Sequence, residues 1–144
     1  MKDLVLRVYL FLRRALLWPS RLSPRGGRVG PEGPAKVLLI RVDRIGDMVM
    51  TMPAARVVKK RYPGARVFFL ASRGAAGLLS GDPYVDGVFL YPEGGGPAAK
   101  LKLLRALRAE KFSLALDFMP DYTLRTALLA FLSGAVSRAG YDVA

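Results

Sequence analysis

The sequence predicts an α/β protein whose open parallel sheet carries helices on both faces. Short apolar runs rich in branched and aromatic side chains recur along the chain, and stretches with apolar residues at helical spacing separate them. A continuous apolar run is typical of a strand that is buried on both faces. Strands that alternate with helices are joined by right-handed crossovers, which places the sheet between two layers of helices. The chain of 144 residues has the size of one such domain.

Residues 1–18 are expected to form an amphipathic basic helix. Its apolar side chains gather on one broad side of a helical projection, and most of its charged side chains lie on the other. Its longest apolar run is too short to cross a bilayer, which takes about 20 residues. Such a helix suits the surface of an anionic membrane, and the candidate membrane contacts are Arg7, Phe11, Arg14 and Trp18. The alternative is a helix that packs on the protein's own body or on another domain.

Residues 19–35 are rich in proline and glycine, which favours a linker without regular structure. The globular domain is therefore expected to cover residues 36–144. Its predicted strands are residues 37–40, 66–71, 87–91, 112–117 and 136–141, and its predicted helices are residues 48–61, 72–80, 98–111 and 123–132. Pro53 either kinks the first helix or opens its main part. The third helix is expected to turn Leu101, Leu104 and Leu107 inward.

A polar loop joins the first predicted strand to the first predicted helix. It holds Arg41, Asp43, Arg44, Gly46 and Asp47 within seven positions. Open α/β sheets bind their ligands at such a place, beyond the carboxyl end of a strand. The loop lacks the glycine-rich patterns of nucleotide phosphate sites. Asp47 has two interpretations: it caps the N-terminus of the helix, the commonest use of aspartate there, or it is a functional carboxylate that faces open space.

Composition narrows the possible chemistry and the possible partners. The chain has no histidine and no cysteine, which excludes Ser-His and Cys-His nucleophile pairs, histidine-ligated metal sites and a disulfide scaffold. Acid–base work near neutral pH is left to carboxylates, lysine or tyrosine. The formal net charge of +12 predicts an anionic partner, namely nucleic acid, an acidic membrane surface or a phosphorylated substrate.

Three segments keep the order and spacing of motifs found in one enzyme family. They are VLLIRVDRIGDMVMTMPA at residues 37–54, YPGA at residues 62–65 and DPYVD at residues 82–86. Together they resemble the amino-terminal half of glycosyltransferase family 9, the ADP-heptose:lipopolysaccharide heptosyltransferases. The resemblance covers roughly residues 36–142 and implies the two-domain GT-B fold. Residues 36–144 would form its Rossmann-like, acceptor-side domain, and the carboxyl-terminal donor domain would be absent from the chain.

The resemblance implies an inverting transfer of heptose from ADP-heptose to an acidic lipopolysaccharide core acceptor. The Gly-Asp pair of the family matches Gly46 and Asp47, so that Asp47 would be the general base and Gly46 would leave space beside its carboxylate. No Asp-x-Asp triplet is present, which agrees with a metal-independent mechanism without a cofactor other than the donor substrate. The implied location is cytoplasmic, peripheral on the cytoplasmic face of the inner membrane. The chain alone is expected to be inactive.

Basic side chains near the strand ends are candidates for binding the carboxylates and phosphates of the acceptor. The candidates are Arg41, Arg44, Arg73 and Arg125, followed by Lys100 and Lys102; ordinary surface charge is the alternative for each of them. One segment departs from the family: DFMPDY at residues 117–122 stands where members carry an Asp-x-Gln-Gly-type turn. This difference leaves the identity of the acceptor open.

Two other interpretations remain. One is a non-catalytic, basic α/β module that docks on an anionic membrane or on nucleic acid. Nucleic acid is the less expected partner, because Phe68, Phe69 and Phe89 fall in predicted strands and should be buried rather than offered for base stacking. The other is a GT-B transferase that uses a different nucleotide sugar.

Overall fold

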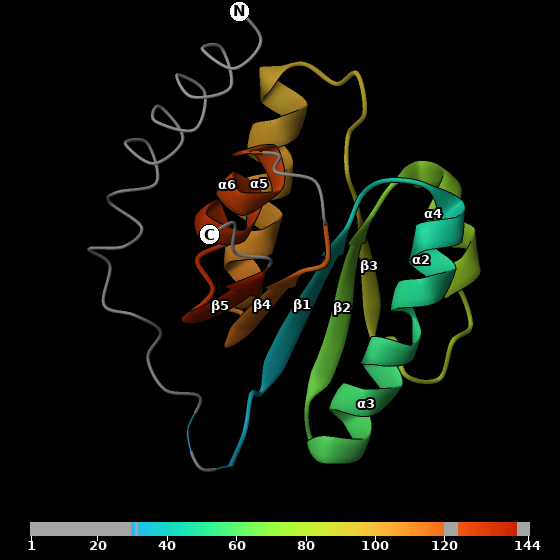
Figure 1. Ribbon diagram of the computed structural model, residues 1–144. Helices are drawn as coiled ribbons and strands as arrows, with labels where there is room; N and C mark the ends of the chain where they lie inside the picture. Colours follow the sequence, from blue (N-terminus) through green and yellow to red (C-terminus); the bar gives the residue numbers. More distant parts are fainter. Residues whose placement is uncertain (1–29, 31, 120–123, 141–144) are drawn as a thin grey trace, which may run out of the picture.

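The computed structural model describes residues 30, 32–119 and 124–140 (Figure 1). The expected helix 1–18, with Arg7, Phe11, Arg14 and Trp18, and nearly all of the linker 19–35 therefore lie outside the described residues. The strands are β1 (Lys36–Arg41), β2 (Arg66–Ala71), β3 (Gly87–Leu90), β4 (Leu114–Asp117) and β5 (Ser137–Gly140). The helices are α2 (Ile45–Thr51), α3 (Pro53–Arg61), α4 (Arg73–Leu79), α5 (Pro97–Glu110) and α6 (Leu124–Leu132).

The five strands form one parallel sheet in the order β3-β2-β1-β4-β5. β1 lies in the middle and pairs with β2 on one side and with β4 on the other. The order reverses at β1, because the chain first builds outward to β3 and then returns to add β4 and β5 across the sheet. The predicted parallel α/β architecture is confirmed. Within the described residues each predicted strand is present with bounds shifted by a few residues, and each helix predicted after residue 36 is present, the first of them as two helices.

Helices cover both faces of the sheet, and the side chains of β1 divide the core between them (Figure 1). Leu38 and Ile40 pack with the buried leucines of α5 and α6. Val37 and Leu39 point to the other face and pack with α2, α3 and α4. Because neighbouring residues of a strand alternate between faces, one uninterrupted apolar run supplies both cores.

The register of α5 differs from the predicted one. Leu103 and Leu107 are buried and Leu104 packs against the same core, whereas Leu101 is 48% exposed. The prediction that Leu101 turns inward was therefore wrong. Four leucines at positions 101, 103, 104 and 107 leave the rotation of the helix about its axis undecided, and packing against the sheet selects the stripe that ends at Leu107.

The first predicted helix is divided into two helices, α2 and α3. The position at which α2 begins excludes the interpretation of Asp47 as an N-cap residue. Pro53 is the first residue of α3, so it opens the main part rather than kinking a continuous helix. α2 begins at Ile45, the N-cap position belongs to Arg44, and no side chain makes a capping hydrogen bond there. Asp47 lies in the first turn of α2 and is not its N-cap.

Candidate active site

The candidate site lies at the carboxyl end of β1, the place where the strand order reverses. β1 ends at Arg41, and α2 begins four residues later, at Ile45. On the other side of β1, β4 ends at the same level, with Asp117 as the register partner of Ile40. Doubly wound sheets bind ligands at such a reversal point, because the loops of neighbouring strands diverge there.

One buried arginine joins the chain segments that meet at this point. Arg41 is 8% exposed. Its Nε lies 2.7 Å from Oδ1 of Asp43, an ion pair rather than a directed hydrogen bond, and its Nη2 lies 3.3 Å from Oδ1 of Asp47. Its Nη1 donates to the carbonyl oxygen of Phe118, the residue after β4. A single guanidinium therefore ties the loop after β1, the first turn of α2 and the end of β4 together.

Asp47 is the most accessible carboxylate of this group. Its side chain is 43% exposed, and it lies at the third position of α2, where free backbone N–H groups and the helix dipole attract a negative charge. A methyl group built on the neighbouring Gly46 would meet no atom within 4 Å. The carboxylate is thus held by Arg41 on one side and borders open space on the other.

Asp43 connects the site to the next strand. Its backbone carbonyl accepts a hydrogen bond of 3.2 Å from Oγ of Ser72, the N-cap residue of α4. Burial raises the pKa of the Asp43 carboxyl above its ordinary value, against the opposing charge of Arg41. The loop after β1 is therefore fixed to β4 through Arg41 and to the start of α4 through Ser72.

A third carboxylate, that of Asp117, lies at the end of β4 and was not among the predicted site residues. Burial raises the pKa of Asp117, although the backbone N–H of Met119, the side chain of Thr126 and the charge of Arg41 oppose that shift. The N–H of Met119 donates to Oδ1 of Asp117 at 3.0 Å. The signal that could have identified it was an aspartate that ends an apolar strand next to the central one.

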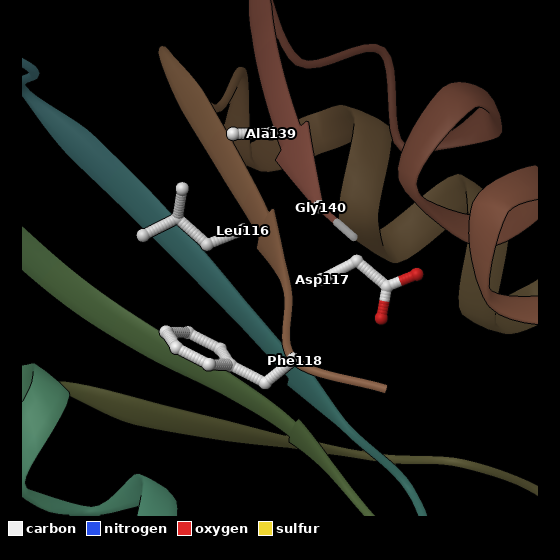
Figure 2. A pocket seen from close by; sticks show the side chains of 5 residues that line it. All are labelled: Leu116, Asp117, Phe118, Ala139 and Gly140. Atoms are coloured by element: carbon white, nitrogen blue, oxygen red, sulfur yellow. The ribbon is translucent and has the colours of Figure 1, made fainter. Parts of the chain in front are cut away.

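A hollow of about 230 Å³ lies beside this strand end. It is lined by Leu116, Asp117, Phe118, Ala139 and Gly140 (Figure 2). The carboxylate of Asp117 points away from the side chains of Leu116 and Phe118 in this view. The wall of the hollow is consequently mostly apolar.

Most of the predicted basic site residues are exposed near the same edge of the sheet. Arg44 is the N-cap residue of α2 and Arg73 is the first residue of α4. Lys100 and Lys102 are exposed in the first turns of α5. Arg125, the second residue of α6, places its guanidinium 5.2 Å from the ring centre of Tyr91. Helices that follow parallel strands begin at the carboxyl edge of the sheet. These side chains therefore lie near the same edge as Asp47, although α5 and α6 cover the other face.

Arg41 differs from the other predicted acceptor contacts. Its guanidinium is buried and already bound to Asp43, Asp47 and the Phe118 carbonyl. It is placed to orient the carboxylates rather than to receive an anion from solvent. Arg41 and Asp47 are the two predicted site residues that the structure brings into direct contact.

The described part of the chain contains neither a group of metal-ligating side chains nor a membrane-spanning helix. In residues 30, 32–119 and 124–140, no three carboxylate, histidine or cysteine side chains gather as a metal site would require. Within these same residues, no helix has the length and apolar character needed to cross a membrane.

A parallel sheet between two helical layers, with a reversal of strand order at its central strand, matches the fold of GT-B-type heptosyltransferases. The chain is 29% identical over 109 residues to lipopolysaccharide heptosyltransferase 2 of Escherichia coli K12, which is 74% of this chain and 31% of the relative. The same protein of Salmonella typhimurium LT2 matches with equal identity and coverage. No protein-family model matches the chain.

Solved structures agree with these sequence matches. The structure of E. coli ADP-heptose LPS heptosyltransferase II superposes with a TM-score of 0.61 at 28% identity, over 73% of this chain and 30% of that one. The glycosyl transferase family 9 protein of Veillonella parvula has a TM-score of 0.66 at 17% identity, over 74% of this chain and 32% of that one, and shows the fold. The resemblance to family 9 heptosyltransferases is confirmed, and this chain spans about a third of the length of those relatives.

Proposed function

We propose that this chain is the acceptor-side domain of an inverting, metal-independent heptosyltransferase that transfers heptose from ADP-heptose to a lipopolysaccharide core acceptor. The names of the relatives supply the reaction class. The observation that carries the proposal is the half-exposed carboxylate of Asp47, held by Arg41 beside the open space at Gly46. A general base needs this combination of fixed orientation and free access.

In the proposed reaction, the acceptor hydroxyl enters the space beside Gly46 and donates a hydrogen bond to Asp47. As the hydroxyl oxygen attacks the anomeric carbon, Asp47 accepts its proton. The bond between the anomeric carbon and the phosphate oxygen breaks, and ADP leaves with the bonding electrons. A single displacement of this kind inverts the anomeric centre.

Charged side chains around this point would orient the acceptor. Arg44, Arg73 and Arg125 would bind its carboxylates and phosphates through charge-assisted hydrogen bonds, with weaker contributions from Lys100 and Lys102. Arg41 would act through Asp47, since it holds the base at the reversal point of the sheet. The donor nucleotide would be held by a second domain.

The proposed domain organisation also includes a membrane contact. Residues 1–18 would lie on the cytoplasmic face of the inner membrane, and residues 19–35 would connect them to the acceptor-side domain. This arrangement would bring a soluble active site to an acceptor that is anchored in lipid.

The test of catalysis uses the two-domain protein that this proposal requires. Asp47→Asn should lower kcat for heptosyl transfer by about 10²–10⁴-fold, the usual contribution of a general base. Because the side chain is half exposed, the thermal midpoint should change little. Turnover at the unmodified rate would exclude Asp47 as the base.

Binding by this chain is tested separately with a deacylated lipopolysaccharide core oligosaccharide. In an NMR titration, the backbone amides of Gly46 and Asp47 should shift, and Asp47→Asn should retain the binding. A saturating titration without a change at these amides would exclude the acceptor-side assignment.

A non-catalytic basic module that docks on an anionic membrane or on nucleic acid is the second candidate, favoured by the net charge of +12. Nucleic acid is the weaker partner. No aromatic side chain of the described residues is fully exposed, and Phe68 and Phe69 are buried, so a stacking platform for bases is missing from this part of the chain. The oligosaccharide titration separates this candidate from the transferase.

A further inference from the structure

Large apolar side chains are exposed mainly on one flank of the described domain. Of its eight exposed large hydrophobic residues, five lie on the three helices that cover the β1–β2–β3 side of the sheet. They are Ile45, Val49, Met50, Val57 and Leu78, exposed by 53%, 50%, 81%, 64% and 40%. We call these five residues the α2–α4 patch. A cluster of this kind is typical of an interaction surface, whereas single exposed apolar residues are common everywhere.

Four members of the patch, Ile45, Val49, Met50 and Leu78, lie on two neighbouring helices. α2 and α4 lie side by side (Figure 1). A methyl group built on Gly74 of α4 would lie 3.7 Å from Cδ1 of Ile45 of α2. Val49 follows Ile45 by one helical turn, and Leu78 follows Gly74 by one turn, so each shares the helix face on which Ile45 and Gly74 approach each other.

The charges around the patch have one sign. Arg44, Arg56 and Arg73 are exposed at its border. Between residues 44 and 80 the only acidic residue is Asp47, and its carboxylate already contacts Arg41. This flank therefore combines exposed apolar side chains with exposed arginines, and residues 44–80 contain no acidic residue other than Asp47.

We propose that the α2–α4 patch docks on the surface of an anionic lipid bilayer. Its apolar side chains enter the boundary between headgroups and acyl chains, and Arg56 contacts lipid phosphates. Arg44 and Arg73, which the proposed function assigns to the acceptor, add to the positive charge of this flank. A second copy of the chain fits this flank less well, because a symmetric contact would bring its arginines together. A nucleic acid fits less well too, because the patch is aliphatic and offers no ring for stacking.

This contact is separate from the membrane contact expected of residues 1–18, and it requires no transferase activity. It has one geometric consequence for the site. Asp47 lies on α2 between Ile45 and Val49, so docking of this helix holds the carboxylate close to the lipid surface.

The absence of cysteine from the sequence allows a direct test on the full chain. Met50→Cys and the control Leu101→Cys, on the opposite side of the sheet, each carry one environment-sensitive fluorophore. With vesicles of phosphatidylcholine and phosphatidylglycerol, the label at position 50 should shift to the blue and be quenched by spin-labelled lipid, while the label at position 101 should not change. High salt should reduce the effect.

Three results of the labelling experiment would overturn the proposal. They are an unchanged label at position 50 in the presence of bound vesicles, equal shifts at both positions, and a blue shift at position 50 that needs only a higher protein concentration. The last would identify the patch as a contact between copies of the chain.

Vesicle co-sedimentation supplies an independent measurement. Met50→Gln/Val57→Gln should weaken partitioning onto the anionic vesicles by about tenfold, because two apolar side chains no longer gain from leaving water. The matched control Leu101→Gln/Val136→Gln removes two apolar side chains that are 48% and 56% exposed and lie outside the patch. Equal binding by the two double variants would overturn the proposal, and circular dichroism would verify that both remain folded.

Discussion

The guanidinium of Arg41 lies 3.3 Å from the carboxylate of Asp47, and it binds the carbonyl of Phe118 with another of its nitrogens. The first contact reaches the helix that follows the central strand, and the second reaches the end of the neighbouring strand β4. Since β1 and β4 are the strands at which the sheet reverses its order, this one side chain spans the reversal point. The orientation of Asp47 therefore depends on Arg41.

Replacing Arg41 should affect both stability and turnover. Arg41→Gln leaves Asp43 and Asp47 without their cation, and it should lower the free energy of unfolding by about 1–3 kcal/mol, as measured by urea denaturation. In the two-domain protein it should lower kcat more than it raises KM, because the base is misplaced while the acceptor contacts remain.

Two comparisons separate this role from general destabilisation. Arg41→Lys keeps the charge but cannot hold two carboxylates and a carbonyl at once, so it should restore stability more than kcat. Arg105→Gln, an exposed arginine on α5, should change the free energy of unfolding by no more than about 0.5 kcal/mol. Unchanged kcat in Arg41→Gln would contradict the positioning role.

Gly46→Ala should make the protein more stable and less active. The residue is helical and does not have a positive φ, so Gly46→Ala should raise the free energy of unfolding by about 0.5 kcal/mol. The added methyl group occupies the space beside Asp47 and should lower the rate of heptosyl transfer by about tenfold or more. The matched control is Gly77→Ala on α4, where a methyl group also meets nothing within 4 Å. Equal transfer rates in both variants would show that the acceptor does not use this space.

The sequence predicted the sheet well because strand signals here are unambiguous. The run from Val37 to Ile40 is apolar at every position, and only a strand between two helical layers buries such a run completely. The place of Asp47 beyond the first strand followed from the strand–loop–helix order and from the family resemblance, whereas the strand order was not predicted. The hydrogen bond from Arg41 to the carbonyl of Phe118 could not be predicted, because only the pairing of β1 with β4 brings these two residues together.

The rotation of α5 about its axis could not be predicted either, because it too is set by packing against residues that are distant in the sequence. Leu103→Ala should lower the free energy of unfolding by about 2–4 kcal/mol, because it removes a buried side chain from the core shared with α6. Leu101→Ala should change it by no more than about 0.5 kcal/mol, because that side chain is 48% exposed. Urea denaturation of both variants measures the difference. A larger loss for Leu101→Ala than for Leu103→Ala would mean that α5 packs in the register that the sequence predicted.

The partly buried carboxyl of Asp117 should give the domain a pH-dependent stability. Burial raises its pKa above the ordinary value of 3.8, so the folded protein holds this proton more tightly than the unfolded chain. The contribution of Asp117 to the free energy of unfolding should therefore fall as the pH rises from 3.8 through the raised pKa. Asp117→Asn keeps an oxygen for the N–H of Met119 but cannot ionise, so urea denaturation from about pH 3 to about pH 7 should show a smaller fall. The fall that remains should include the share of Asp43, whose pKa burial also raises. Parallel curves for the two proteins would contradict the assignment to Asp117.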